Sequence, residues 1–261
     1  MLAELRQRLQ AMQRPPGIDD DHGVLPLGLP AVDAALGGGL ARGALHEIAA
    51  PSEPHVAAAT RFALALALAS LTAAASRKNI LWIAEDMALI ESGAPYGPGL
   101  AQFGLPPEQL LTVAVAHRRD LLWAMEESLR CRSVSAAIGE MRHGELDPVA
   151  LRRLSLAAAT HGALALLLRA SPAEDASTAA TRWIVGAAPS DFSTVADDTM
   201  PTGEPLEPGP PRLAAHLIRN RRGPGGSWIL QWSDNDERFT RATPAEPLAA
   251  PPPDRPGRQV A

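Results

Sequence analysis

The architecture of this chain is set by residues 46–69, HEIAAPSEPHVAAATRFALALALA. They begin as a short apolar strand, pass through a turn that contains Pro51 and Pro54, and continue as a long run rich in alanine and leucine. The alternation in ALALALA alone would suit a strand, but alanine and leucine are strong helix formers and the run is longer than a typical strand. The sequence therefore predicts a helix over about 55–76. Strand, turn and helix in this order are the layout of a phosphate-binding loop.

The residues that such a loop needs for its chemistry are replaced. A phosphate-binding loop uses glycines so that backbone N–H groups can surround the phosphate oxygens, a lysine to reach the terminal phosphates, and a Ser or Thr hydroxyl to bind Mg²⁺. With the strand end setting the register, Ala50 and His55 stand at the glycine positions, Val56 at the lysine position and Ala57 at the hydroxyl position. No shift of register supplies the lysine, because the chain contains only Lys78. We expect nucleotide binding to be weak or absent, with no cofactor and no catalytic residue here.

Apolar strands and helices alternate beyond this loop. Asp147 and Pro148 mark the start of one helix, as N-cap and first helical residue. Continuous apolar strands that alternate with helices predict an α/β fold, with a mostly parallel sheet and helices on both faces. The turn GPGG at 223–226 predicts a C-terminal antiparallel hairpin. The predicted strands cover 44–50, 79–85, 111–116, 133–139 and 163–170, and further helices cover 119–132 and 147–162.

The chain divides into three predicted parts. Residues 1–23 comprise a short N-terminal helix over 1–14 and a linker with two prolines and three aspartates. Residues 24–233 form one globular domain, in which three consecutive glycines at 37–39 permit positive φ in a tight turn. Residues 234–261 are charged and then rich in proline, so we expect a disordered tail.

Composition excludes several classes of function. The net charge is −5 and the pI about 5.8, so the chain as a whole does not attract nucleic acid, and DNA contact is expected to be indirect or weak. One cysteine, Cys131, excludes an internal disulfide and a cysteine-based metal site. The run 56–76 approaches the length of a membrane span, but it contains Arg61 and much alanine, so we expect a buried helix and no membrane partner. The N-terminus lacks the pattern of a secretory signal, which predicts a cytoplasmic protein.

Several segments, in order, carry a family resemblance. They are LPLGLPAVDAALGGGLARGALHEI (25–48), RDLLWAMEESLRC (119–131), LRRLSLAAATHGALALLLR (151–169), AATRWIVGAAPS (179–190) and LIRNRRGPGGSWILQW (217–232). The first is similar to the start of a RecA-like core, and together they resemble the ImuA family of inducible-mutagenesis, RecA-like proteins over about 24–233.

This resemblance implies a RecA-like, P-loop NTPase-type core and a non-catalytic role in the SOS response to DNA damage. The protein would be an accessory factor in error-prone translesion DNA synthesis (SOS mutagenesis). The implied partners are an ImuB-type polymerase-like protein and an error-prone replicative DNA polymerase subunit, with RecA as a further candidate.

The resemblance also implies where acidic site residues would lie. Glu85, at the end of LWIAE, stands where RecA-like enzymes carry a water-activating glutamate, and Glu140 stands near the strand-end acid that supports Mg²⁺. Ala170 stands where a polar residue would sense the γ-phosphate. Carboxylates without a bound triphosphate have nothing to act on, so we interpret both acids as residual or structural.

Further basic, aromatic and acidic residues lead to three expectations. Arg219, Arg221 and Arg222 precede the GPGG turn and resemble basic residues that RecA-like proteins use at a subunit interface. Three interpretations of these arginines stay open: contact with a partner's acidic surface, contact with DNA phosphates, and a solvated turn without a binding role. Partner contact is preferred because the chain is acidic. The five tryptophans, Trp123 among them, are expected to pack in the core. The helix at 119–132 is expected to expose Glu126.

Functions from other classes stay open beside the non-catalytic adaptor. A DNA-stimulated ATPase would need Arg61, or an arginine of a neighbouring subunit, to replace the lysine. A regulator of the RecA filament, or a cell-division inhibitor, would use the same scaffold to dock on another protein.

Overall fold

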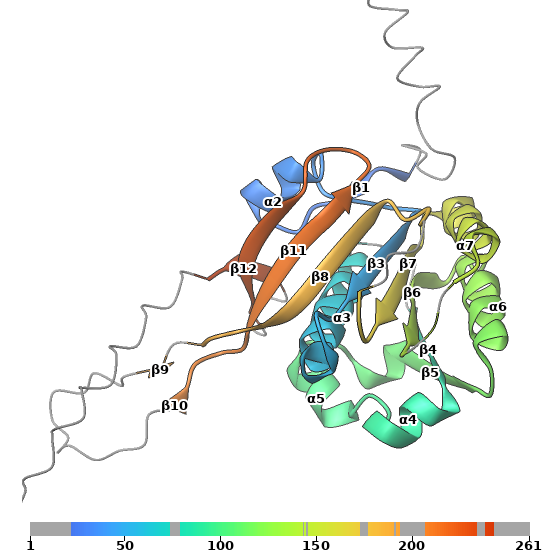
Figure 1. Ribbon diagram of the computed structural model, residues 1–261, viewed down its shortest axis with the longest axis horizontal. Helices are drawn as coiled ribbons and strands as arrows, with labels where there is room; N and C mark the ends of the chain where they lie inside the picture. The colour runs from blue at the N-terminus through green and yellow to red at the C-terminus, as the bar shows by residue number, and fades with distance from the viewer. Residues whose placement is uncertain are drawn as a thin grey trace, which may run out of the picture.

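The computed structural model describes most of the predicted domain (Figure 1). The described residues are 22–73, 79–142, 144, 146–172, 177–190, 192–193, 207–233 and 238–242. The helix predicted over 1–14 and the part of the predicted tail beyond 242 lie outside the described residues.

Among the described residues, nine strands form one sheet in the order β13-β12-β11-β8-β3-β7-β6-β4-β5 (Figure 1). Neighbouring strands from β8 to β5 are parallel, whereas β8, β11, β12 and β13 pair antiparallel. The mostly parallel sheet with a C-terminal antiparallel hairpin is therefore confirmed. The strands are β3 (Leu45–Ala49), β4 (Asn79–Glu85), β5 (Leu110–Val115), β6 (Val134–Met141), β7 (Leu164–Arg169), β8 (Thr181–Ala188), β11 (Arg212–Asn220), β12 (Gly226–Ser233) and β13 (Arg238–Arg241). Two small ribbons pair β1 (Val24–Leu25) with β2 (Leu40–Ala41), and β9 (Phe192–Ser193) with β10 (Glu207–Pro208).

Helices cover both faces of the parallel strands, as predicted. The long helix α3 (Val56–Thr72) crosses one face, and α6 (Arg118–Leu129) and α7 (Pro148–His161) cover the other (Figure 1). The carboxylate of Asp147 accepts a hydrogen bond from the N–H of Val149 at 3.0 Å, which confirms the predicted N-cap of α7. The shorter elements are α2 (Pro30–Ala35), α4 (Asp86–Ser92), α5 (Gly97–Gln102), and the 3₁₀ turns η2 (Glu53–His55) and η3 (Pro107–Gln109).

Side chains of the parallel strands alternate between two apolar layers. In β7, Leu164, Leu166 and Leu168 belong to the layer that contains α3, whereas Ala165 and Leu167 belong to the layer beneath α6 and α7. All five are buried. A sheet that is covered on both faces therefore explains why these strands read as uninterrupted apolar runs.

The helix α3 is the central element of its layer. The segment Glu53–Thr72 is long and apolar enough to pass for a membrane span by composition. Its side chains Phe62 and Leu66 are fully buried against the sheet, as expected for a core helix. Packing inside the domain thus accounts for its hydropathy.

The predicted domain boundary at 233 is wrong. Strand β13 pairs with β12 beyond that point, and Phe239 within it is 2% exposed. Its ring centroid lies 5.5 Å from that of Phe62 and 5.1 Å from that of Trp232. Phe239 therefore belongs to the core, and the sheet extends to Arg241.

Two predictions for the helix α6 are also wrong. Trp123 is 61% exposed on α6 and does not pack in the core. Glu126 is buried, and Arg130 and Arg153 form ion pairs with its two carboxylate oxygens at 2.5 and 2.6 Å.

The strand order places the loop after β3 at a switch in connectivity. From β3 the chain crosses β7 and β6 to reach β4, whereas the later strand β8 pairs with the opposite edge of β3. In open α/β sheets a crevice forms at the carboxyl ends of the strands where the connections change direction. The loop after β3 therefore lies at the crevice in which ligands bind in folds of this class.

Candidate functional site

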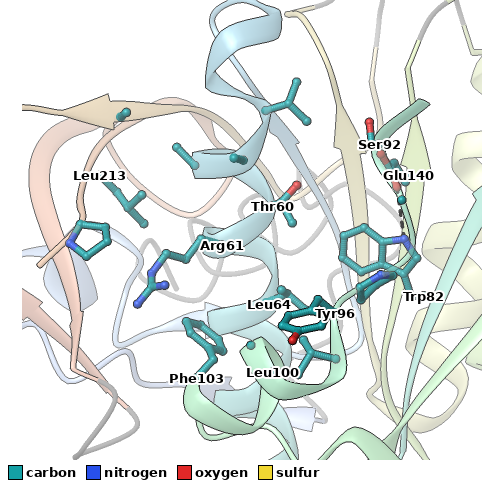
Figure 2. Close-up of a pocket in the computed structure, with 18 of the residues that line it drawn as sticks. Thr60, Arg61, Leu64, Trp82, Ser92, Tyr96, Leu100, Phe103, Glu140 and Leu213 are labelled. Atoms are coloured by element: carbon teal, nitrogen blue, oxygen red, sulfur yellow. Dashed lines mark hydrogen bonds between the residues drawn. The ribbon is translucent and has the colours of Figure 1, made fainter. Parts of the chain in front are cut away.

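A pocket of about 760 Å³ lies at this crevice, beside the first two turns of α3 (Figure 2). The loop after β3 and the pocket side of α3 form one wall, and the segment from Ser92 to Phe103 forms another. Trp82 of β4, the end of β6 and the first residues of β11 complete the lining. A triphosphate would occupy this position if the loop were a phosphate-binding loop.

The backbone of the loop supplies few N–H groups to this pocket. Pro51 and Pro54 have no N–H to donate. The N–H of Ala50, at the predicted first glycine position, donates to the carbonyl oxygen of Arg169 at 3.0 Å. Since a phosphate cradle is built from consecutive backbone N–H groups, three of its donors are missing or already used.

The 3₁₀ turn η2 uses two more backbone N–H groups of the loop. The N–H of His55 donates to the carbonyl oxygen of Ser52 at 3.0 Å, and the N–H of Val56 donates to the carbonyl oxygen of Glu53. The imidazole Nδ1 of His55 accepts a hydrogen bond from the N–H of Ala187 in β8 at 3.0 Å. The loop is therefore closed on itself and attached to the sheet.

The pocket side of α3 has no phosphate-binding side chain at the expected positions. Val56 and Ala57 line the pocket at the lysine and hydroxyl positions. One turn later, Thr60 and Arg61 also line it. The guanidinium of Arg61 lies 4.8 Å from the ring centroid of Phe103, so its charge faces the aromatic wall, as Figure 2 shows. Val56 and Ala57 therefore offer a triphosphate neither a cation nor a hydroxyl at the expected positions.

The carboxylate of Glu140 lies in the pocket and already has partners within the protein. Its Oε2 accepts a hydrogen bond from the indole N–H of Trp82 at 3.2 Å (Figure 2), and its Oε1 pairs with Nε of Arg142 at 3.3 Å. Arg142 also donates to the hydroxyl of Ser92. A Mg²⁺ ion requires oxygen ligands, and an adjacent guanidinium repels it. The donor set around Glu140 therefore does not fit a metal site.

The other two positions taken from the resemblance lie at the ends of strands near Glu140 but do not line the pocket; Ala84 pairs with Glu140, so Glu85 takes the opposite face of the sheet. Glu85 ends β4, is half-buried and immediately precedes α4. Ala170 follows the last residue of β7 and is buried. Among the described residues that line the pocket, Glu140 is present, but Glu85 and Ala170 are not. The structure does not bring the two acids together into one site.

The three arginines near the GPGG turn lie at the opposite end of the sheet from the pocket. Asn220 pairs with Thr181 at the start of β8, whereas Arg212, which lines the pocket, pairs with Ala188 at its end. Arg219 is exposed at the end of β11 and Arg222 lies close to Gly37. The predicted contact of these arginines with a partner or with DNA stays a prediction.

Arg221 has a structural role at this end of the sheet. Its Nε and Nη2 each donate at 2.9 Å, to the carbonyl oxygens of Ala179 and Ser177 respectively. Burial, followed by the nearby charge of Arg219, lowers the pKa of the Arg221 guanidinium. Arg221 therefore holds the connection that leads into β8.

Sequence reasoning missed the partners of Glu140. Trp82 was expected in the core, and Arg142 received no role. One signal was available: Glu140 and Arg142 are two residues apart at the end of a strand, a spacing that places both side chains on one face. The contribution of Trp82 depends on the pairing of β4 with β6.

A buried histidine lies in β3, the strand that leads into the loop. His46 is fully buried; its Nε2 donates to the carbonyl oxygen of Ala41 at 2.9 Å, and its Nδ1 accepts from the hydroxyl of Thr181 at 2.8 Å. Desolvation lowers the pKa of His46 to about 4, although the hydrogen bond to Ala41 acts in the opposite direction. The imidazole is therefore neutral in the folded protein at pH 7.

Comparisons with known proteins bear on the fold and the family. No protein-family model matches the chain. The chain is similar to the proteins named "Protein ImuA" of two strains of Caulobacter vibrioides, each 32% identical over 215 residues that cover 80% of this chain and 83% of the relative. Among solved structures, the crystal structure of the RadB recombinase matches with a TM-score of 0.55 and 15% identity, covering 84% of this chain and all of that one. The fold is therefore RecA-like.

Proposed function

The chain belongs to the ImuA family, and from this membership we propose that it is a non-catalytic, RecA-like accessory protein of SOS-induced, error-prone translesion DNA synthesis. It acts in the cytoplasm by binding other proteins. The partners are an ImuB-type polymerase-like protein and an error-prone replicative DNA polymerase subunit.

The backbone of the loop after β3 is the observation that carries the non-catalytic part of the proposal. Pro51 and Pro54 have no N–H, and the N–H groups of Ala50, His55 and Val56 are bonded to carbonyl oxygens of the protein. A triphosphate placed here would lose most of its backbone donors, and burying its charge without them costs several kcal/mol. The scaffold is retained while its nucleotide chemistry is not.

The acid in the pocket supports the same conclusion. Glu140 forms an ion pair with Arg142, whose side chain is 11% exposed, and so is neutralised within the protein. The adjacent guanidinium opposes the binding of a metal ion at this carboxylate. We therefore assign Glu140 to stability rather than to catalysis.

Association with the polymerase-like partner tests the proposal directly. The purified full-length chain and the purified partner are mixed and analysed by size-exclusion chromatography and biolayer interferometry, with and without Mg²⁺-ATP. We expect a complex whose affinity is unchanged by the nucleotide. Absence of a complex between two folded proteins would count against the proposal, as would a complex that forms only with ATP.

A second candidate, a DNA-stimulated ATPase, is favoured by one observation. Thr60 and Arg61 line the pocket one turn beyond the loop and offer a hydroxyl and a cation. ATP turnover, measured with and without single-stranded DNA, separates the two candidates. We expect no turnover above that of buffer; turnover that is lost on Glu85→Gln would replace the adaptor proposal with the enzyme.

A further inference from the structure

The short helix α4 and the turn after it concentrate apolar side chains that the fold leaves uncovered. Among the described residues, eight large apolar or aromatic side chains are exposed, and three of them, Met87, Ile90 and Tyr96, lie in the segment 87–96. Met87 is 62% and Ile90 75% exposed. Scattered apolar residues are ordinary on a protein surface, but several in one short segment indicate a surface that another molecule covers.

The periodicity of α4 explains which of its side chains face outward. Ala88 is buried and Leu89 packs against the core, so these two attach the helix to the domain. Met87 and Ile90 are three residues apart and therefore lie on the same side of the helix. Figure 1 shows α4 at the margin of the domain, beyond the ends of β4 and β5. The two apolar side chains are thus presented to solvent together.

Two carboxylates lie beside this apolar pair. Asp86 and Glu91 are exposed, and each lies four residues along the helix from one of the two apolar residues. Within the part of the chain that the structure describes, neither carboxylate has an ion pair or a side-chain hydrogen bond, and the last turn of α4 contains no basic residue. Asp86, Met87, Ile90 and Glu91 together form the α4 surface.

Glu91 does not serve the stability of the helix. It precedes Ser92, the last residue of α4. The C-terminus of a helix carries a partial negative charge, so a carboxylate in the last turn is mildly unfavourable. Ile90 likewise gains little free energy from folding, because most of its surface stays in water. Neither side chain stabilises the isolated chain, whereas a partner that covers the α4 surface would use both.

The two kinds of side chain define the chemistry of the occupant. A partner surface that removes Met87 and Ile90 from water is apolar at its centre. Covering the carboxylates of Asp86 and Glu91 costs free energy unless a cation neutralises them, so that surface carries Arg or Lys beside its apolar residues. The same acids repel nucleic acid and anionic membranes. The α4 surface is therefore complementary to a basic and apolar segment of a protein.

We propose that the α4 surface binds a segment of the polymerase-like partner in which Arg or Lys lies next to bulky apolar side chains. The apolar side chains pack on Met87 and Ile90, and the basic side chains pair with Asp86 and Glu91. This inference rests on the proposed function, because it assigns a surface to the binding of that partner.

The test measures the affinity of the full-length partner for variants of the full-length chain by biolayer interferometry. The double variant Met87→Ser, Ile90→Ser removes the apolar pair. Leu156→Ser is the matched control, because Leu156 is also an exposed aliphatic residue, at 50%, but lies on α7 across the sheet. We expect the double variant to bind at least ~10-fold more weakly and Leu156→Ser to change the affinity less than ~2-fold. Circular dichroism and thermal melting verify that each variant is folded.

Charge reversal tests whether the occupant is basic. Glu91→Lys should weaken binding at least ~5-fold while its Tm stays equal to that of the wild type or rises slightly, because lysine suits the end of a helix better than glutamate. Glu127→Lys makes the same change of charge at an exposed position on α6 and should leave the affinity within ~2-fold. Equal affinities of Glu91→Lys and the wild type would exclude a basic occupant.

The outcomes separate this inference from the proposed function. If the wild-type chain does not bind the partner, the proposed function fails and this inference fails with it. If the wild type binds and the α4 variants bind equally well, the proposed function stands and the inference is wrong. A wild-type dimer, detected by light scattering, that the double variant abolishes would show that a second copy of the chain covers the α4 surface, and would likewise overturn the inference.

Discussion

Replacing Glu140 separates a structural carboxylate from a catalytic one. Its two oxygens accept from Trp82 at 3.2 Å and pair with Arg142 at 3.3 Å, and the two charged side chains are 9% and 11% exposed. Removing one partner of a buried pair costs about 3–5 kcal/mol, because the other charge is left in a poorly solvated place. Both contacts are long, so we expect Glu140→Ala to lower the free energy of unfolding by about 3 kcal/mol.

For a domain of this size that loss corresponds to a fall in Tm of about 6–12 °C. Glu140→Gln keeps an acceptor for Trp82 but removes the charge, so about 1–2 kcal/mol is expected. Urea unfolding followed by circular dichroism measures both, with Glu85→Gln as the control, since Glu85 is half-buried at the end of β4. A Glu140→Ala variant within about 0.5 kcal/mol of wild type would refute the structural role. So would a Tm that Mg²⁺ raises in the wild type but not in the variant.

Three further changes test other parts of the structure. Burial lowers the pKa of His46 from 6.5 to about 4, so the free energy of unfolding should be highest above pH 6.5 and should fall by about 3 kcal/mol as the pH drops toward 4. Urea unfolding at several pH values should show this dependence on pH, and His46→Gln should lack it. Phe239→Ala should cost about 3–5 kcal/mol by chemical unfolding, whereas Arg241→Ala on the same strand should stay within about 0.5 kcal/mol; equal effects would contradict the place of β13 in the core. Restoring lysine and threonine at Val56 and Ala57 should not create ATP binding in a fluorescence titration, because the backbone donors of the loop remain engaged; binding by this double variant would show that the side chains alone were limiting.

Local patterns made most of the fold predictable from the sequence. Uninterrupted apolar runs indicated parallel strands covered on both faces, and Asp147 before Pro148 indicated the start of α7. The strand β13 was missed because RFTR has one apolar side chain, that of Phe239, and its packing depends on Phe62, which is distant in the sequence, and on Trp232 of the neighbouring strand β12. The pairing of β13 with β12 in the folded protein, and not a local sequence pattern, determines this strand.

The candidate site was predictable only in part, for the same reason. The replacement of lysine and hydroxyl by Val56 and Ala57 can be read directly from the sequence. The sequence does not show that the backbone N–H groups of the loop are used within the loop, or that Trp82 donates to Glu140. Both features depend on η2 and on the neighbouring strands. Glu126 illustrates the same limit: its partner Arg153 comes from the adjacent helix, so the pattern of α6 alone predicted exposure.

Isothermal titration calorimetry of the purified chain with Mg²⁺-ATP tests whether this RecA-like scaffold has lost its triphosphate site. We expect no saturable heat of binding up to millimolar nucleotide, in the presence or absence of single-stranded DNA. Saturable binding with a micromolar Kd that Thr60→Trp abolishes would place the nucleotide in this pocket and show that the triphosphate site is intact.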